Sequence, residues 1–153
     1  MSVSYRHTQI GYVTITSLGV AIAVLGYMAA AAPSMAIVPV LLVTAIAFVL
    51  FATLTTTVEP GVLEVRFGPG VIRRRINLSD IQNVRVVRNP WYCGWGIRWI
   101  GRGWLWNVSG LQAVELELRG GRRFRIGTDQ PQLLTRALRE PLSAADPRRA
   151  RFG

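Results

Sequence analysis

Hydrophobic and polar residues follow two different patterns along the chain, and the change comes near residue 55. Before it, residues 11–32 and residues 34–58 contain no charged side chain. An α-helix rises about 1.5 Å per residue, so roughly 20 apolar residues cross a hydrocarbon core of about 30 Å. The pattern therefore predicts two transmembrane helices, over residues 10–32 and 35–54.

The two apolar stretches meet at Pro33 and Ser34, where a proline ends the first helix and a short polar pair permits a reversal. This arrangement predicts a helical hairpin. A cleaved signal peptide is the alternative, because small residues surround Pro33. However, the first stretch is longer than the 7–15 residues typical of a secretory core, and only Arg6 precedes it. Two buried helices of a soluble protein fit less well, since too little chain remains to enclose them.

After residue 55, apolar and polar residues alternate, as they do in half-buried strands. The segments "VLEVRF", "NVRVVR", "AVELEL" and "RRFRIG" follow this pattern and are separated by glycine-rich turns. We expect six or seven short antiparallel strands. Asp129 then begins one amphipathic helix as its N-cap, and Pro141 ends it.

The predicted fold is a transmembrane α-hairpin followed by an all-β barrel or sandwich that one C-terminal helix closes. We divide the chain into a cytoplasmic N-terminus (1–9), the two membrane helices (10–54), a β domain (55–141) and a disordered basic tail (142–153).

Charge predicts the orientation of the hairpin. The formal net charge is +10, and every basic residue is an arginine. Apart from Arg6, all of them follow Glu59, while the turn at Pro33 has none. The positive-inside rule therefore predicts a multi-pass protein of the plasma (inner) membrane with both termini cytoplasmic. A basic domain beside a membrane has lipid headgroups as its nearest anionic partner, so we expect contact with the lipid bilayer and not with nucleic acid.

Several motifs occur in an order that resembles the bacterial pleckstrin-homology-like domains of small membrane proteins. These are "LSDI", "GWGIR", "GLQAVEL" and "RIGTDQP", between residues 78 and 131. The resemblance covers about residues 55–141, and a preceding transmembrane hairpin is a common companion in that family. It implies a PH-like fold and a membrane location, without a settled biochemical activity.

Residues suited to catalysis are sparse. The one histidine, His7, precedes the first membrane helix, where we expect it to have no partner, and the one cysteine, Cys93, has no nearby histidine. Glu115 and Glu117 share a strand face, which we interpret as solvated charge beside arginines. We therefore expect a protein that is not an enzyme, with no catalytic residue, cofactor or metal.

All five tryptophans fall between residues 91 and 106, among glycines and arginines. Three interpretations stay open: core packing, contact with the membrane interface, and contact with a protein partner or a second copy. The candidate contact residues are Trp91, Trp95, Arg98, Trp99 and Arg102.

A second group of arginines surrounds the "FGPG" turn, namely Arg66, Arg73, Arg74 and Arg75. Basic residues around the first hairpin of eukaryotic pleckstrin-homology domains hold phosphates, so the resemblance implies an anion site here. A charged, solvated strand edge is the alternative. The function expected is a non-enzymatic interaction or assembly module with a protein partner or self-association. Anionic headgroup binding and an accessory subunit of a transport or envelope-stress system are the alternatives.

Overall fold

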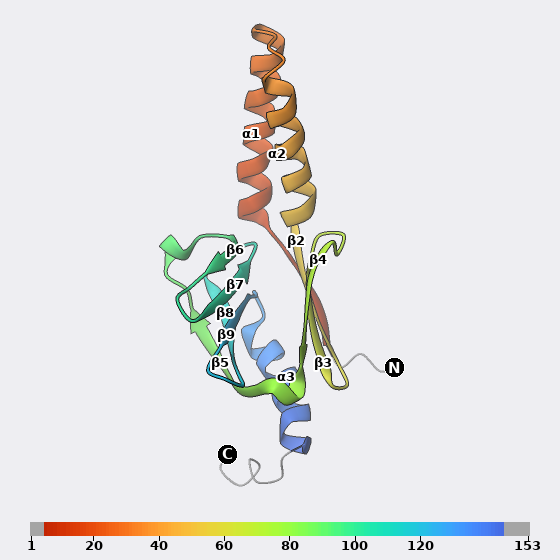
Figure 1. Cartoon of the computed structure of the whole chain (residues 1–153), viewed down its shortest axis with the longest axis vertical. Helices are drawn as coiled ribbons and strands as arrows, with labels where there is room; N and C mark the ends of the chain where they lie inside the picture. The colour runs from red at the N-terminus through yellow and green to blue at the C-terminus, as the bar shows by residue number, and fades with distance from the viewer. Residues whose placement is uncertain (1–4, 146–153) are drawn as a thin grey trace.

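A computed structural model describes residues 5–145 of the chain. It consists of two apolar helices, a β domain of two sheets, and a C-terminal helix (Figure 1). The helices are α1 (Tyr12–Ala31), α2 (Ile37–Phe51) and α3 (Pro131–Ala145). A strand-rich domain with a terminal helix is confirmed.

Helices α1 and α2 lie side by side and project from one end of the β domain (Figure 1). None of the residues in these two fully described helices is buried. α1, with 20 residues, is long and apolar enough to cross a membrane, whereas α2 has 15 residues. Both are shorter than the predicted spans. Ile10, Thr53 and Leu54 belong to β-strands, and residues 32, 35 and 36 belong to the connection between the helices.

The first sheet contains four antiparallel strands in the order β1-β2-β3-β4. Their bounds are β1 (Tyr5–Ile10), β2 (Thr53–Glu59), β3 (Val62–Phe67) and β4 (Ile72–Asn77). Strand β1 lies in the segment that we expected to be an N-terminus outside the domain, and that expectation was wrong. The helical hairpin returns the chain to its starting point, so β1 can pair with β2 although the two are far apart in sequence.

The second sheet contains five strands in the order β5-β8-β9-β7-β6. Their bounds are β5 (Ile81–Arg88), β6 (Gly96–Trp99), β7 (Gly103–Asn107), β8 (Gln112–Leu118) and β9 (Arg123–Gly127). Strands β7 and β9 are parallel. The described residues therefore form nine strands, not the expected six or seven, and not all of the pairs are antiparallel.

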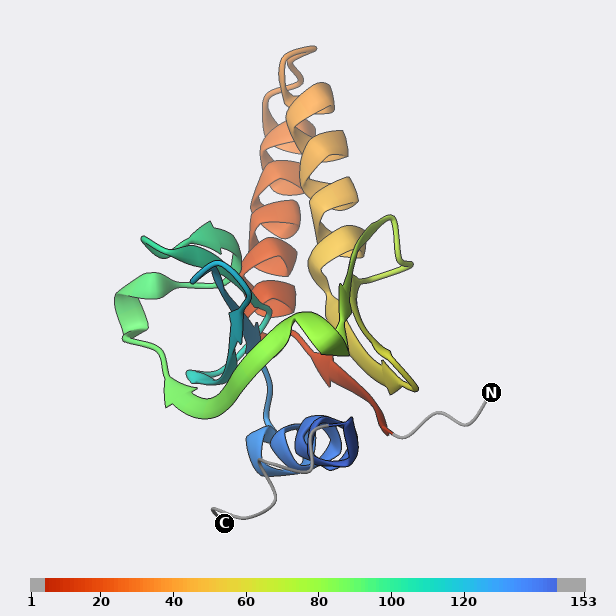
Figure 2. The ribbon, with the colours of Figure 1, turned by 60° about the horizontal axis from the view of Figure 1, so that its bottom comes forward.

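The core lies between the two sheets, which stand on opposite sides of the domain with α3 across the end remote from the hairpin (Figure 2). Trp106 packs between Phe67 and Phe124, with ring centroids 5.2 and 5.5 Å away. α3 contributes two fully buried leucines, Leu134 and Leu138.

Two expectations about α3 were wrong. The helix continues through Pro141 to Ala145, so the domain extends beyond residue 141. A proline inside a helix removes one backbone hydrogen bond without preventing further turns. The expected N-cap, Asp129, does not hold that position either, because the backbone nitrogen of Leu134 donates to the carbonyl oxygen of Gln130 at 3.1 Å, which makes Gln130 the residue before the first turn. The rest of the predicted tail, residues 146–153, lies outside the described residues.

The hairpin joins the β domain without a linker. β1 runs into α1 and α2 runs into β2, so the hairpin occupies the position of the loop in a β1–β2 hairpin. The backbone nitrogen of Gly11 donates to the carbonyl oxygen of Ala52 at 2.8 Å. Thr14 of α1 donates its hydroxyl to the carbonyl oxygen of Val108 at 2.9 Å. These bonds hold the helices in a defined position on the domain.

Candidate functional site

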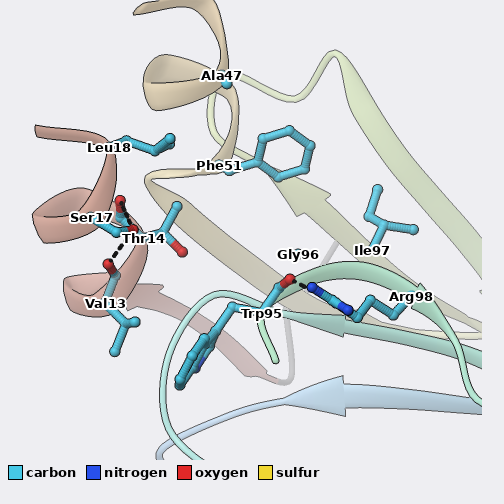
Figure 3. Close-up of a pocket in the computed structure, with 10 residues that line it drawn as sticks. All are labelled: Val13, Thr14, Ser17, Leu18, Ala47, Phe51, Trp95, Gly96, Ile97 and Arg98. Atoms are coloured by element: carbon cyan, nitrogen blue, oxygen red, sulfur yellow. Dashed lines mark hydrogen bonds between the residues drawn. The ribbon is translucent and has the colours of Figure 1, made fainter. Parts of the chain in front are cut away.

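A groove of about 400 Å³ opens where α1 and α2 meet the edge strand β6 (Figure 3). We call it the helix-base groove. Its apolar lining consists of Val13, Leu18, Ala47, Phe51, Trp95 and Ile97. Its polar lining includes Thr14, Ser17 and Arg98. The groove thus combines the foot of the apolar hairpin with one tryptophan and one cation.

The polar groups of the groove differ in how many of their hydrogen-bonding atoms have a partner within the protein. Thr14 donates to the Val108 carbonyl, and Ser17 Oγ donates to the Val13 carbonyl at 2.8 Å. Arg98 donates through Nε to the carbonyl oxygen of Trp95, at a long 3.4 Å (Figure 3). Within residues 5–145, no carboxylate lies within ion-pair distance of Arg98. Its guanidinium is therefore free to bind an anion from outside.

Gly94 allows Arg98 to take this position. A Cβ built at Gly94 would lie 3.2 Å from the guanidinium, and the backbone there has a φ of +65°, which side chains other than glycine rarely adopt. Arg98 thus folds back over the chain that precedes its own strand. The "GWGIR" sequence consequently holds the tryptophan and the arginine at the same edge of the groove.

The five tryptophans occupy different environments. The exposed fraction is 77% for Trp91, 36% for Trp95, 59% for Trp99 and 39% for Trp104, but 7% for Trp106. Core packing therefore explains Trp106, while the other four offer surface to solvent or to a partner.

The candidate contact residues do not form one surface. β6 pairs with β7 from Gly96 opposite Asn107 to Trp99 opposite Trp104. The Gly96 end lies beside α1, since the next residue after Asn107 accepts a bond from α1. Strands advance about 3.3 Å per residue, so Trp99 lies about 10 Å farther from the helices.

The remaining candidates lie outside the groove. Trp99 forms an edge-to-face pair with Trp104, with ring centroids 5.3 Å apart. Arg102 lies beyond them in the β6–β7 turn, and Trp91 begins a short 3-10 turn, Trp91–Cys93. Only Trp95 and Arg98 of the five candidates line the helix-base groove.

The candidate anion residues are also divided. Arg66 lies opposite Arg73, and Glu64 lies opposite Arg75, so these residues share one face of the first sheet. Arg74 is on the other face, with its guanidinium carbon 4.9 Å from the centroid of the Phe124 ring. The bond from Arg75 Nε to Glu64, at 2.5 Å, lowers the pKa of that carboxyl. The structure brings three of the four arginines together and separates Arg74 from them.

Glu115 is not solvated, contrary to the sequence interpretation. Its side chain is 1% exposed and accepts hydrogen bonds from Arg85 and from Arg125 Nε, the latter at 2.6 Å. Burial is the largest influence and raises the pKa of Glu115, but the bonds and charges of Arg125 and Arg85 together outweigh it, so the pKa lies below its ordinary value. Both oxygens are occupied by guanidinium groups, so this carboxylate links β5, β8 and β9 and has a structural role.

His7 has a partner, which also differs from the expectation. Its Nε2 lies 2.6 Å from Asp129 Oδ1, and this contact joins β1 to the segment before α3. Cys93 is a partly exposed free thiol. Over the described range 5–145, His, Cys, Asp and Glu do not form a group of three that could hold a metal ion.

No protein-family model matches the sequence, and no curated protein is significantly similar to it. The function has therefore to be inferred from the helices, the groove and the distribution of charge.

Proposed function

We propose that this protein is a membrane-anchored, non-enzymatic interaction or assembly module whose β domain lies at the cytoplasmic face of the plasma (inner) membrane. The observation that carries the proposal is the hairpin itself, which has no charged and no buried residue. A helix that is apolar on all sides and uncovered by protein is stable in lipid and not in water. Both α1 and α2 cross the bilayer in this proposal.

The shortness of α2 is compatible with that position. Fifteen residues span about 22 Å, less than a hydrocarbon core of about 30 Å. The connection between the helices, residues 32–36, is uncharged and includes Met35, which is 86% exposed. Such a tip can enter the apolar layer, and local thinning of the bilayer compensates for a short span.

The PH-like nature of the β domain is part of the proposal. Two sheets followed by one helix that packs on β5 and β8 support it. Strand β1 and the parallel β7–β9 pair are additions to the antiparallel meander that the resemblance implies.

Contact with anionic lipid headgroups is a second candidate function, which the helix-base groove favours. The groove opens beside the proposed membrane helices, so its height matches the interfacial layer. Tryptophan suits that layer because its ring is apolar and its N–H is polar. Arg98, without an acidic partner among the described residues, is available to a lipid phosphate.

The topology can be tested with a phosphatase reporter that is active only outside the cytoplasm. Fused after Gly153 it should be silent, and inserted at Ser34 it should be active. Activity after Gly153 would reject the cytoplasmic placement. Silence at both positions, with the protein in the membrane fraction, would reject the spanning hairpin.

Headgroup contact can be tested without the hairpin. Because Ile10 and Thr53 are cross-strand partners, an Asn-Gly turn can replace residues 11–52 and join β1 to β2. This variant should sediment with vesicles that contain anionic phospholipid. Arg98→Gln should weaken that binding about fivefold, since one arginine near such a surface contributes about 1 kcal/mol. Arg102→Gln is the matched control, and an equal loss there would reject a specific role for the Trp95–Arg98 edge of the groove, which is the part that remains without the helices.

A further inference from the structure

A second cluster of arginines lies between the two sheets and combines two residues of the predicted anion set, Arg74 and Arg75, with two arginines that were not singled out in the sequence. It surrounds a pocket of about 210 Å³, which we call the distal arginine pocket. Its charged lining consists of Arg74 and Arg75 from β4, Arg119 and Arg122 from the β8–β9 turn, and Asp80. Elements from both sheets therefore contribute cations to one small space.

The pocket lies at the end of the β domain that is remote from the hairpin. Ile72, at the start of β4, is close to α2. It pairs with Phe67, and the next residue, Gly68, lies so near α2 that a Cβ on it would be 2.6 Å from the carbonyl oxygen of Val49. From there β4 runs away from the helices to Asn77, a distance of about 17 Å. In Figure 1 the link between β4 and β5 and the β8–β9 turn lie at the end of the domain opposite the helices. The pocket is therefore open to the aqueous side.

The positive charges of the pocket exceed the negative charges that face it. Arg75 is paired with Glu64. Across residues 5–145, Arg74, Arg119 and Arg122 have no carboxylate within ion-pair distance, although Asp80 lines the same pocket. The uncompensated cations are thus concentrated at one place.

Arg74 has the least favourable position of the three. Its guanidinium lies over the Phe124 ring, in the space between the sheets. Burial, and then the positive charge of Arg122, lower the pKa of Arg74 from its usual value. Both influences disfavour the charged form of Arg74, and an anion in the pocket would stabilise that form.

We propose that the distal arginine pocket binds a small soluble anion with two adjacent phosphate groups. Guanidinium groups bind phosphate oxygens through paired N–H donors, and three arginines, one from β4 and two from the β8–β9 turn, can surround a diphosphate. The pocket volume admits a group of this size and not a large ligand as a whole. Its distance from the hairpin separates it from the protein's own bilayer.

Isothermal titration calorimetry with inorganic pyrophosphate tests the proposal on the full-length protein in nanodiscs of phosphatidylcholine. The wild-type protein should bind at low ionic strength. Arg122→Gln, and separately Arg119→Gln, should weaken binding about tenfold or more, since each removes charge-assisted hydrogen bonds. Both residues are exposed in a turn, so neither change should affect folding.

Arg73→Gln is the matched control, because Arg73 precedes Arg74 on the same strand and is exposed on the opposite face. It removes the same charge and should change the affinity less than about twofold. The proposal is overturned if the wild-type protein does not bind pyrophosphate, or if Arg73→Gln weakens binding as much as Arg122→Gln does.

A second arm separates a soluble anion from a lipid headgroup. In nanodiscs that contain phosphatidylglycerol, the difference between wild type and Arg122→Gln should persist. Competition by the anionic lipid that abolishes this difference would assign the pocket to headgroups and overturn the proposal for a soluble ligand.

Discussion

The two ends of the β domain use arginine in different ways. At the helix end, Arg98 stands alone beside Trp95 and the apolar foot of the hairpin. At the far end, Arg74, Arg119 and Arg122 meet in a pocket that contains one carboxylate. Attraction to headgroups is screened within a Debye length of about 8 Å at physiological ionic strength, so the far cluster is too distant to benefit from it. A net charge of +10 therefore does not describe a single membrane-binding surface.

The tryptophans are divided between the core of the domain and its surface. Trp106 is in the core, whereas Trp95 borders the groove and Trp99 lies on the outer surface. Replacing Trp106 by alanine should lower the free energy of unfolding by about 3–5 kcal/mol, the range for a large aromatic side chain removed from a core. Urea denaturation of the detergent-solubilised protein, followed by circular dichroism, measures this loss.

Trp99→Ala is the control for that change, because Trp99 is 59% exposed. It should reduce stability by less than about 1 kcal/mol, the amount lost with one aromatic pair at the surface. Equal losses for both variants would contradict the division between core and surface tryptophans.

The firm attachment of the domain to the hairpin can be broken at Gly68. A Cβ there would lie 2.6 Å from the carbonyl oxygen of Val49 in α2, at a φ of +45°. Gly68→Ala should therefore destabilise the protein by about 2–4 kcal/mol, through backbone strain and overpacking together. Thermal denaturation in the same detergent detects it.

Gly61→Ala separates these two causes. Gly61 also has a positive φ, of +86°, but a Cβ there meets no atom within 4 Å. Only the strain, about 1 kcal/mol, should remain. If both variants lose the same stability, the contact between the β3–β4 turn and α2 does not hold the domain in place.

Between the two ends of the domain, Arg85 and Arg125 are paired with the buried carboxylate of Glu115, and a substitution there tests how much this pairing stabilises the fold. Glu115→Gln leaves Arg85 and Arg125 without a counter-charge and should destabilise the protein by about 2–3 kcal/mol, less than for a fully buried pair because both arginines are partly exposed. Glu117→Gln, on the same strand but partly exposed, should have a smaller effect. Equal losses of unfolding free energy for the two variants in urea denaturation would show that the ion pairs of Glu115 with Arg85 and Arg125 add no stability beyond that of an exposed charge.

The same carboxylate predicts a dependence of stability on pH. The pKa of Glu115 is lower in the folded protein than its ordinary value of 4.5. Its contribution is therefore complete above pH 4.5 and is lost as the pH falls through the lower, folded pKa. The stability difference between wild type and Glu115→Gln should shrink on acidification over this range. If the stability difference between the two proteins grows as the pH falls below 4.5, the pKa of Glu115 is raised in the folded protein and this prediction is wrong.

Local patterns predicted the parts of the fold that depend on nearby residues. Uncharged stretches predicted both apolar helices, and alternation predicted most strands. β1 was missed because its partner lies beyond the hairpin, and the parallel β7–β9 pair was missed because alternation does not indicate strand direction. The contact between His7 and Asp129 joins residues 122 positions apart, for which a single sequence has no signal.

The candidate sites were predicted less completely for the same reason. The sequence identified Trp95 and Arg98, but not the helical wall that completes their groove, because residues 13–18 and 95–98 meet only in the folded chain. The three arginines of "IRRRIN" were treated as one group, although a strand places alternate residues on opposite faces. Arg74 therefore lies with the arginines of the β8–β9 turn, although Arg75 also borders their pocket, while Arg73 is on the opposite face of the strand.

The central claim is that the helix end of the domain rests in the membrane interface. Full-length variants that keep a single surface tryptophan, either Trp95 or Trp99, with Trp106 retained and the others replaced by phenylalanine, can be reconstituted in vesicles with brominated lipids. A variant with Trp106 alone provides the background. Quenching of fluorescence should be strong for Trp95 and weak for Trp99, which lies about 10 Å farther from the helices. Equal quenching of the two, or none for Trp95, would contradict the account.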